Sequence, residues 1–399
     1  MRKSLSVSRR IHSLFLTLEF PEGIAPGEGG DYNVLMLARN GKDQPVLRGT
    51  ALAGALRHAF WQHLEDTGNP EPEAEVRAFF GYASGNDNEA ANDQESRLKV
   101  SDSVLDIGKS TVMTRTHHLR HRHTGSVADA GLFSMELCPP GTKTTAALWL
   151  QDDQEEPEDA TRFLSVLVEC LAHGIALGGN AARGIGRVIL PDLGVYRRYE
   201  LAKVEDHAAW LNDHRAWRQN PATTPVSQDE LATTVNGDGK RLEVHIKLGI
   251  PRGQDLLIGD GQGGRYQIEP QRVIKADGKQ YWRLPGSSLR GLFRGWVTRL
   301  AAREGKPVAD NLLRQLRIQR GELEPGIHAY NGNNLGWCFA SDDDRHAGKR
   351  PDCPVSCLFG SLFKAGRIHI SDAYAECSSD ETDKAIAEEQ LRRHVAVDR

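Results

Sequence analysis

Three cysteines and a histidine in the last quarter of the chain have the spacing of metal ligands. They follow the pattern Cys338-x7-His346-x6-Cys353-x3-Cys357, within 20 residues of a polar, glycine-rich stretch. Thiolate and imidazole groups bind zinc tetrahedrally, and four of them leave no open position for catalysis. The spacing therefore predicts a structural zinc site, in which His328 is the alternative to His346.

A glycine followed by hydroxyl residues opens two predicted helices. The sequences are GTALAGALR from Gly49 and GSSLRGLFR from Gly286. Free N–H groups and the positive end of the helix dipole favour an anion at such a tip, and we expect the hydroxyl residues to be the helix caps. The candidate anion contacts are Gly49, Thr50, Arg57, Gly286, Ser287, Ser288, Arg290 and Arg294. For the arginines, a surface salt bridge is the alternative.

Two further stretches are candidates for anion binding. The loop Gly178–Gly186 (GGNAARGIG) carries Arg183 at its centre. Successive backbone N–H groups in such loops form anion sites, although a tight turn between a helix and a strand explains the glycines equally well. The histidine-rich stretch 115–123 includes Arg115 and Arg122. It predicts either a polyanion contact or an exposed basic strand.

The two helix motifs belong to an internal repeat. The matching positions are Gly49 with Gly286, Leu52 with Leu289, Gly54 with Gly291, and Arg57 with Arg294. A Phe-Gly pair followed by a strand with a Ser-Asp motif also occurs twice, within 78–105 and 357–375. The loops GEGG (27–30) and GQGG (261–264) form a third, weaker pair. Three anchors in one order predict two copies of one domain.

Hydrophobic patterns indicate the elements that position these motifs. Alternating leucines, valine and isoleucine predict that each copy begins with a strand, near 14–18 and near 242–246. A glycine-rich loop, a helix and more strands follow, and the first copy adds a helix at about 160–173. This order favours an α+β fold of two tandem ferredoxin-like (RRM-like) domains. The expected divisions are 1–218 for the first domain, 219–239 for a linker and 240–399 for the second domain.

The second copy is expected to carry a zinc insertion at about 330–357 and to be incomplete at its carboxyl end. Gly286 and Gly360 are 74 positions apart, against 32 between Gly49 and Gly81. An insert with few core residues needs a stabilising metal. No counterpart of the first copy's last helix follows, and both a truncated chain and completion by another chain are open explanations.

Composition and charge exclude several classes of protein. The chain has 399 residues, a net charge of −4, 39% hydrophobic residues and 26% charged residues, which is typical of globular domains. No apolar stretch approaches the ~20 residues of a membrane span, and we expect a cytoplasmic protein without a signal peptide. Basic residues gather in stripes at 97–123 and 283–303, a distribution that fits contact with a polyanion.

Together these motifs resemble the RAMP superfamily of CRISPR-associated proteins. The likeness rests on GTALAGALR and PGSSLRGLFR, on Phe-Gly before the Ser-Asp strand, and on GGNAARGIGRV, over most of 1–200 and 240–399. It is closest to the backbone subunits of type III interference complexes, and the tandem resembles the fused proteins of types III-D and III-E, which also carry zinc fingers. The resemblance implies contacts with guide RNA, target RNA and other effector subunits, and a thumb-like hairpin from 115–123.

In that family the cleaving residue is an acidic one in the loop after the first strand. Asp31 matches this slot, with Asp43 as the fallback. The resemblance implies attack by the 2′-OH of the target RNA on the adjacent phosphate, assisted by Mg²⁺ or another divalent cation. In the second copy Arg265 occupies the slot, with Glu269 and Asp260 near it, so cutting by that copy is in doubt.

We therefore expect an endoribonuclease that binds guide RNA and cleaves target RNA, with a structural Zn²⁺, no small-molecule substrate and no membrane contact. Three alternatives are open. The chain is a non-catalytic scaffold, or a ribonuclease that trims precursor guide RNA with the histidines of 115–123 as acid and base, or a zinc protein unrelated to RNA.

Overall fold

The described part of the chain is a mixture of helices and strands, which agrees with the α+β class. The computed structural model describes residues 10–27, 34–82, 93–120, 127–152, 158–178, 184–191, 194–220, 242, 244–249, 271–306, 354–360 and 366–375. The helices are α1 (Gly49–Asp66), α2 (Pro72–Phe80), α3 (Glu158–Ala172), α4 (Val204–Gln219), α5 (Gly286–Arg303) and α8 (Pro354–Phe359). The strands are β1 (Arg10–Phe20), β2 (Val34–Leu35), β3 (Val46–Leu47), β4 (Leu98–Val100), β5 (Ser103–Val104), β6 (Met113–Arg120), β7 (Val127–Leu137), β8 (Thr142–Asp152), β9 (Ile175–Ala176), β10 (Arg187–Val188), β11 (Val195–Glu200), β12 (Arg272–Ile274), β13 (Gln280–Leu284) and β14 (Ala373–Tyr374).

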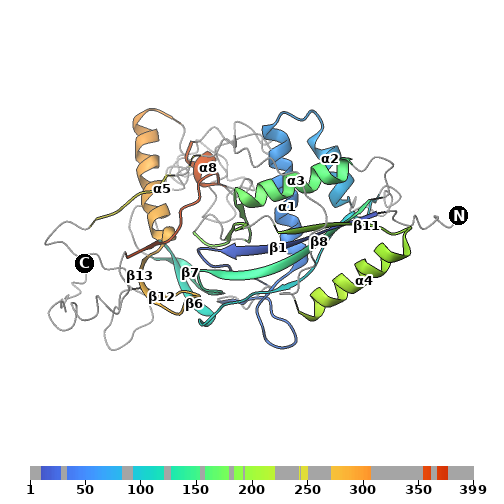
Figure 1. Ribbon diagram of the computed structural model, residues 1–399. Helices are drawn as coiled ribbons and strands as arrows, with labels where there is room; N and C mark the ends of the chain where they lie inside the picture. Colours follow the sequence, from blue (N-terminus) through green and yellow to red (C-terminus); the bar gives the residue numbers. More distant parts are fainter. Residues whose placement is uncertain are drawn as a thin grey trace, which may run out of the picture.

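A four-stranded sheet with the order β11-β1-β8-β4 organises the first copy (Figure 1). The long strand β1 lies inside the sheet and pairs antiparallel with β8 on one side and β11 on the other. Successive side chains of a strand point to opposite faces. Leu14, Leu16 and Leu18 share one face and are fully buried in the main core, as their alternation predicts.

Helices α1 and α3 pack on that buried face. Leu52, Leu56 and Phe60 of α1 follow helical spacing, and each is at most 1% exposed. The Phe60 ring meets Phe163 of α3 edge-on, with 4.9 Å between ring centroids. Burying each such side chain contributes about 1.5–3 kcal/mol, so this contact sets how the two helices lie on the sheet. Among the described helices, none combines the length and the apolar composition that a membrane crossing requires.

The opposite face of the sheet is covered by α4, a helix that the sequence patterns did not predict. Trp217 packs against Phe15 and Ala147 on this face. The Asp213 carboxylate accepts a hydrogen bond of 2.7 Å from the Tyr199 hydroxyl of β11, which fixes the helix to the edge strand. Indole and imidazole rings recur through α4, and that recurrence was the available signal.

A buried polar cluster lies where β1, β8 and β11 meet. His12 Nδ1 lies 2.7 Å from the Tyr196 hydroxyl, and His12 Nε2 lies 3.3 Å from Asp152. Arg10 and Arg97 also pair with Asp152, at 3.0 and 3.2 Å. Burial lowers the pKa of His12 even though Asp152 opposes the shift. Asp152 is therefore balanced by the two arginines rather than by an imidazolium.

Residues 115–120 of the basic stretch lie in β6, which pairs antiparallel with β7. Met113 pairs with Leu137 at one end of the hairpin and Arg120 with Val127 at the other. Strand β2 adds to β7 in parallel. The tip of the hairpin, which includes Arg122, lies outside the described residues.

The second copy repeats the approach to the helix. In the first copy β3 leads into α1, and Leu47 lies opposite Ser103 of β5. In the second, β13 leads into α5, and Leu284 lies opposite Ala373 of β14. Each leucine lies two residues before the helix glycine, and each partner directly follows the Ser-Asp motif. The duplication that the sequence predicts is therefore present in the tertiary structure.

The strand predicted at the start of the second copy is not formed. The described residues 242 and 244–249 lie outside any strand, and Leu242, Val244 and Ile246 are 85%, 64% and 61% exposed. In the first copy β8 and β11 hold the corresponding strand, and the described residues of the second copy supply no strand in these places. An alternating pattern needs neighbouring strands to become part of a sheet.

The two copies contact each other through the turn between β12 and β13. The Ala276 N–H donates to the Pro140 carbonyl oxygen at 2.9 Å, and the Lys109 N–H donates to the Ala276 carbonyl oxygen at 3.3 Å. The Ser110 hydroxyl donates to the Ile274 carbonyl oxygen at 3.0 Å. Backbone contacts of this kind fix the turn of the second copy on the first.

Candidate nucleic-acid interface

Each helix tip is closed by an aspartate from its own copy. The Gly49 N–H donates to Asp102 Oδ1 at 2.8 Å, and the Gly286 N–H donates to Asp372 Oδ1 at 2.7 Å. In both copies the aspartate belongs to the Ser-Asp motif. Within each copy, the glycine that begins the helix therefore contacts the Ser-Asp motif. The aspartate places a negative charge at the positive end of the helix dipole.

Only glycine fits where each helix begins. A Cβ atom on Gly49 would lie 2.2 Å from the Val100 carbonyl oxygen, and one on Gly286 would lie 2.2 Å from the Ile370 carbonyl oxygen. These carbonyls belong to the chain just before Asp102 and Asp372. The missing side chain lets the helix approach the strand closely enough for the carboxylate to reach the N–H group.

This geometry corrects two expectations about the tips. The helices begin at the glycines, after Arg48 and Pro285, so Thr50 lies inside the first turn and is not the cap. The anion held by the glycine N–H groups is a carboxylate of the chain. In the sequence, Asp102 and Asp372 appear only as anchors of the repeat, although an aspartate at the same place in both copies was the signal for this role.

The side chains predicted to contact an anion at the first tip are open to solvent, whereas Gly49 is buried. Thr50 and Arg57 are exposed. Arg48 pairs with Asp102 at 3.1 Å, with side-chain exposures of 37% and 53%. Because this pair is hydrated, it contributes at most about 1 kcal/mol and leaves both groups accessible. A polar, accessible tip is what a phosphate strand would require.

The second tip distributes its predicted contacts differently. Ser288 is exposed, whereas Ser287 and Arg294 are half-buried. Arg290 is buried, and its guanidinium donates to the Phe359 carbonyl oxygen of α8. Arg290 thus has an internal partner in α8, and its contact with RNA stays a prediction.

Arg115 likewise has an internal partner, which lies in the other copy. Its guanidinium donates to both oxygens of Asp372, at 3.0 and 2.9 Å, and both side chains are buried. Arg283 lies 3.7 Å from the same carboxylate. Burial and the nearby Arg115 lower the pKa of Arg283 to about 10. Arg115 therefore forms a buried ion pair between the copies, and its contact with RNA stays a prediction.

The glycine-rich loop of the first copy also reaches the second copy. A Cβ atom on Gly184 would lie 2.5 Å from the Ile370 carbonyl oxygen. Gly184 therefore lies against the segment before β14 that carries Asp372. Arg183, at the centre of the loop, lies outside the described residues.

The candidate cleaving residues fall mostly outside the described residues. These are Asp31, Asp260, Arg265 and Glu269. Asp43, the fallback, lies at the tip of an exposed turn with a φ of 61°. Its carboxylate pairs with Arg39 at 3.5 Å, and 87% of its side chain is exposed. Asp31 as the cleaving residue stays a prediction.

The predicted zinc ligands are mostly outside the described residues as well. Cys338, His346 and Cys353 fall there, and Cys357 lies half-buried on α8. Within the described ranges, no three His, Cys, Asp or Glu side chains lie close enough to hold a metal ion. Burial raises the pKa of Cys138 to about 12, as it does that of Cys170. Both thiols stay neutral, which makes them poor metal ligands.

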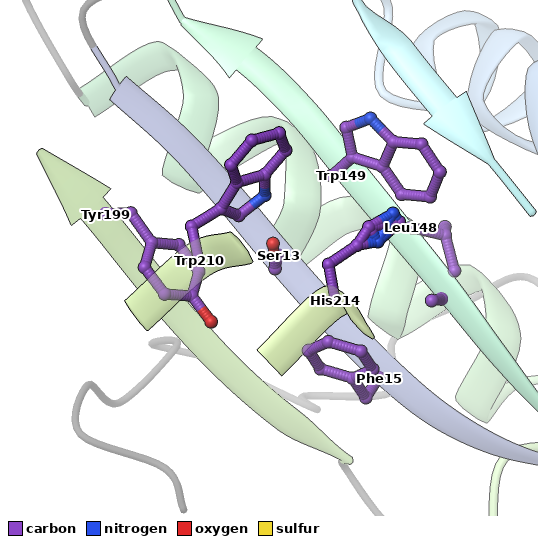
Figure 2. Close-up of a pocket in the computed structure, with 8 residues that line it drawn as sticks. Ser13, Phe15, Leu148, Trp149, Tyr199, Trp210 and His214 are labelled. Carbon is purple, nitrogen blue, oxygen red and sulfur yellow. The ribbon is translucent and has the colours of Figure 1, made fainter. Parts of the chain in front are cut away.

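A small pocket lies between α4 and the outer face of the sheet (Figure 2). It is lined by Ser13, Phe15, Ala147, Leu148, Trp149, Tyr199, Trp210 and His214. The centroids of the Trp149 and His214 rings lie 4.8 Å apart. Burial, with a smaller effect of Arg218, lowers the pKa of His214. The enclosed space admits about one water molecule, so a nucleobase does not fit inside it.

Comparison with known proteins supports one family. A family model described as the RAMP superfamily matches residues 23–189 and 254–399. The two matched regions contain the two helix tips and their aspartates, whereas β11 and α4 lie between them. A search of curated proteins finds no match.

Proposed function

Because the chain belongs to the RAMP superfamily, with two matched regions, we propose that it is a guide-RNA-binding backbone subunit of a type III CRISPR interference complex that cleaves target RNA. Membership makes it a CRISPR-associated protein of an RNA-binding family. The observation that carries the proposal is the duplicated helix tip, in which a glycine-begun helix meets a Ser-Asp strand in both copies. Two such units in one chain suit successive stretches of one RNA strand.

We expect the RNA phosphates to contact the accessible groups around the tips. In the first copy these are Thr50 and Arg57, and in the second Ser288 is the most exposed. Replacing Arg57 by Ala should weaken RNA binding and reduce the slope of log K against log salt by about 1. Arg162 is a matched control, because it is an exposed arginine of another helix that already pairs with Glu75 at 2.6 Å. Equal slopes for the two variants would remove Arg57 from the interface.

Cleavage would use the target RNA's own 2′-OH. Its oxygen attacks the adjacent phosphorus, the bond from phosphorus to the 5′-oxygen breaks, and that oxygen leaves with a proton. The products are a 2′,3′-cyclic phosphate and a 5′-OH. Asp31 would take the hydroxyl proton or hold the hydroxyl in line. A divalent cation would neutralise charge on the phosphate oxygens.

Substitution of Asp31 tests this chemistry. The full chain is assembled with guide RNA, supplied with Mg²⁺ and given an end-labelled complementary RNA. Asp31→Ala should lose at least about 100-fold in cutting rate, the scale of general-base contributions, with unchanged target binding. Asp43→Ala is the control and should cut like the parent. If Asp31→Ala cuts at the parental rate, Asp31 is not the cleaving residue, and if the parent itself does not cut, the chain is a scaffold.

The trimming of precursor guide RNA is the second candidate function, favoured by the four histidines within 115–123. Histidine acid–base chemistry needs no metal, so trimming should continue in EDTA. Incubation of precursor repeat RNA with the chain and EDTA distinguishes this function from metal-assisted cutting of the target.

We also propose a structural zinc held by Cys338, His346, Cys353 and Cys357, which the short spacing of these ligands supports.

We further propose a ferredoxin-like arrangement for each copy. The strand order of the first copy's sheet, with two helices on one face, supports this arrangement.

A further inference from the structure

Helix α5 carries a stripe of apolar side chains on its exposed side. Leu292, Trp296 and Leu300 are spaced by four residues and are 57%, 53% and 52% exposed, which places them on one helical face. The neighbouring Phe293 and Val297 pack into the core of the second copy. Large apolar side chains grouped on one exposed face mark interaction sites. We call these three residues the α5 stripe.

The first copy shows what covers the equivalent face. Counted from the glycine that begins each helix, Leu292 corresponds to Ala55 of α1, and Trp296 corresponds to Ala59. Helix α3 packs on α1 (Figure 1). The Cys170 thiol of α3 lies 3.8 Å from the Ala59 carbonyl oxygen. The equivalent of the α5 stripe is thus in contact with a second helix.

Side-chain size decides which helix can cover α5. Two alanines on α1 allow α3 to bring Phe163 and Cys170 into contact with it. Packed helices lie about 8–10 Å apart at protein density. The larger Leu292 and Trp296 fill more of the space between the axes than the alanines of α1 do. A helix with small residues opposite the stripe therefore fits α5 best.

Charge gives a second constraint on that helix. Residues 283–303 contain five arginines and no acidic residue. Arg299 lies next to the stripe, 5.7 Å from the centre of the Trp296 ring, and Arg303 is exposed one turn further. A partner with acidic residues at its edges would pair with these arginines. In the first copy α3 is acidic too, with Glu158, Asp159 and Glu169 against Arg162.

We propose that the α5 stripe binds an amphipathic helix of another polypeptide, whose contact face carries Ala, Gly or Ser and whose edges are acidic. Such a helix would pack on α5 as α3 packs on α1. Leu242, Val244 and Ile246 of the second copy are exposed as well. This docking is independent of whether the chain cuts RNA.

A tethered helix tests the size rule directly. Residues 158–172 are appended to the full chain through a Gly/Ser linker of ~20 residues, which spans about 25 Å and gives an effective concentration near millimolar. One version keeps the α3 sequence. The other replaces Phe163, Leu167 and Cys170 by Ala, because these residues share one helical face. Hydrogen exchange of residues 286–303 is the measurement.

The small-faced helix should slow exchange in 286–303 at least tenfold more than the native α3 sequence. The chain variant with Leu292→Ala and Trp296→Ala should reverse that order, because it restores the alanines of α1. Val204→Ala is the control, since Val204 is 85% exposed on α4, and it should change nothing.

Three results would overturn the proposal. The first is no slowing of exchange by either helix. The second is slowing that persists when Trp296 is replaced by Asp. The third is protection of the stripe by guide RNA but not by the helix, which would assign Trp296 and Arg299 to base stacking instead.

Discussion

Gly286 and Gly291 lie in the same helix, yet their surroundings differ. A Cβ atom on Gly286 would lie 2.2 Å from the Ile370 carbonyl oxygen, whereas one on Gly291 would meet nothing within 4 Å. Gly286→Ala should therefore destabilise the chain by about 2 kcal/mol or more through displacement of the strand. Gly291→Ala should stabilise it by about 0.5–1 kcal/mol through helix propensity.

Chemical denaturation of the full chain, with hydrogen exchange of 286–303, measures both changes. The first copy provides an independent pair. Gly49→Ala should behave like Gly286→Ala, because its Cβ would lie 2.2 Å from the Val100 carbonyl oxygen, and Gly54→Ala should behave like Gly291→Ala. Equal stabilities of the two variants within a pair would show that the fold does not need the close approach of the first helix glycine to the neighbouring carbonyl oxygen.

At the scale of elements, the strands around β1 should make stability depend on pH. Burial lowers the pKa of His12 in the folded chain, while the unfolded chain has a histidine pKa near 6.5. Below pH 6.5 the unfolded state binds the proton and the folded state resists it. The free energy of unfolding should therefore be highest above pH 6.5 and fall below it, by up to about 1.4 kcal/mol per pH unit for one histidine.

Urea denaturation of the full chain between pH 7.5 and 5.5 checks this slope. His12→Gln should flatten the curve. His214 on α4 adds to the same slope, because its pKa is lowered too, and His214→Gln should remove its part. A pH profile that neither substitution changes would contradict the burial of a neutral imidazole in this sheet.

The second element-scale prediction concerns the polar insert before α8. If the proposed zinc is bound, the purified chain should contain about one zinc per molecule by elemental analysis. Cys353→Ser should lose the metal and lower the melting temperature, because structural zinc contributes folding free energy. Cys377→Ser is the control and should keep the metal, since Cys377 lies outside the proposed ligand set. Full zinc content in Cys353→Ser would refute that set.

At the scale of the whole molecule, Asp372 connects the two copies. It holds Gly286 of its own copy and Arg115 of the other, with 1% of its side chain exposed. The side chain of its counterpart Asp102 is 53% exposed, and in the described part of the chain it pairs with Arg48 and Gly49 of its own copy. The same residue type at equivalent positions therefore has two different structural roles.

Asp372→Asn should cost about 3–5 kcal/mol, because it leaves the Arg115 guanidinium buried without a counter-charge. Asp102→Asn should cost about 1 kcal/mol or less, because its ion pair is hydrated. Calorimetry of the full chain compares the two variants. If both lose the same stability, Arg115 and Asp372 do not form a buried pair in solution.

Sequence patterns alone were enough to predict the repeat, the strand at Leu14–Leu18 and helices α1, α3 and α5. Glycines, alternating apolar residues and helical spacing are local properties that any fold must respect. Family membership follows from the same motifs, because their order is preserved in both copies. The zinc ligands and Asp31 stay predictions, since they lie mostly outside the described residues.

Only the tertiary structure decided which partner each polar group takes. Arg115 has the positive charge and the hydrogen-bond donors of an RNA contact. In the folded chain it pairs with an aspartate 257 positions away. The 242–246 pattern is as good as that of β1, yet its described residues form no strand. A residue's type limits its chemistry, whereas burial and the arrival of a distant strand determine whether that chemistry faces RNA or the protein's own interior.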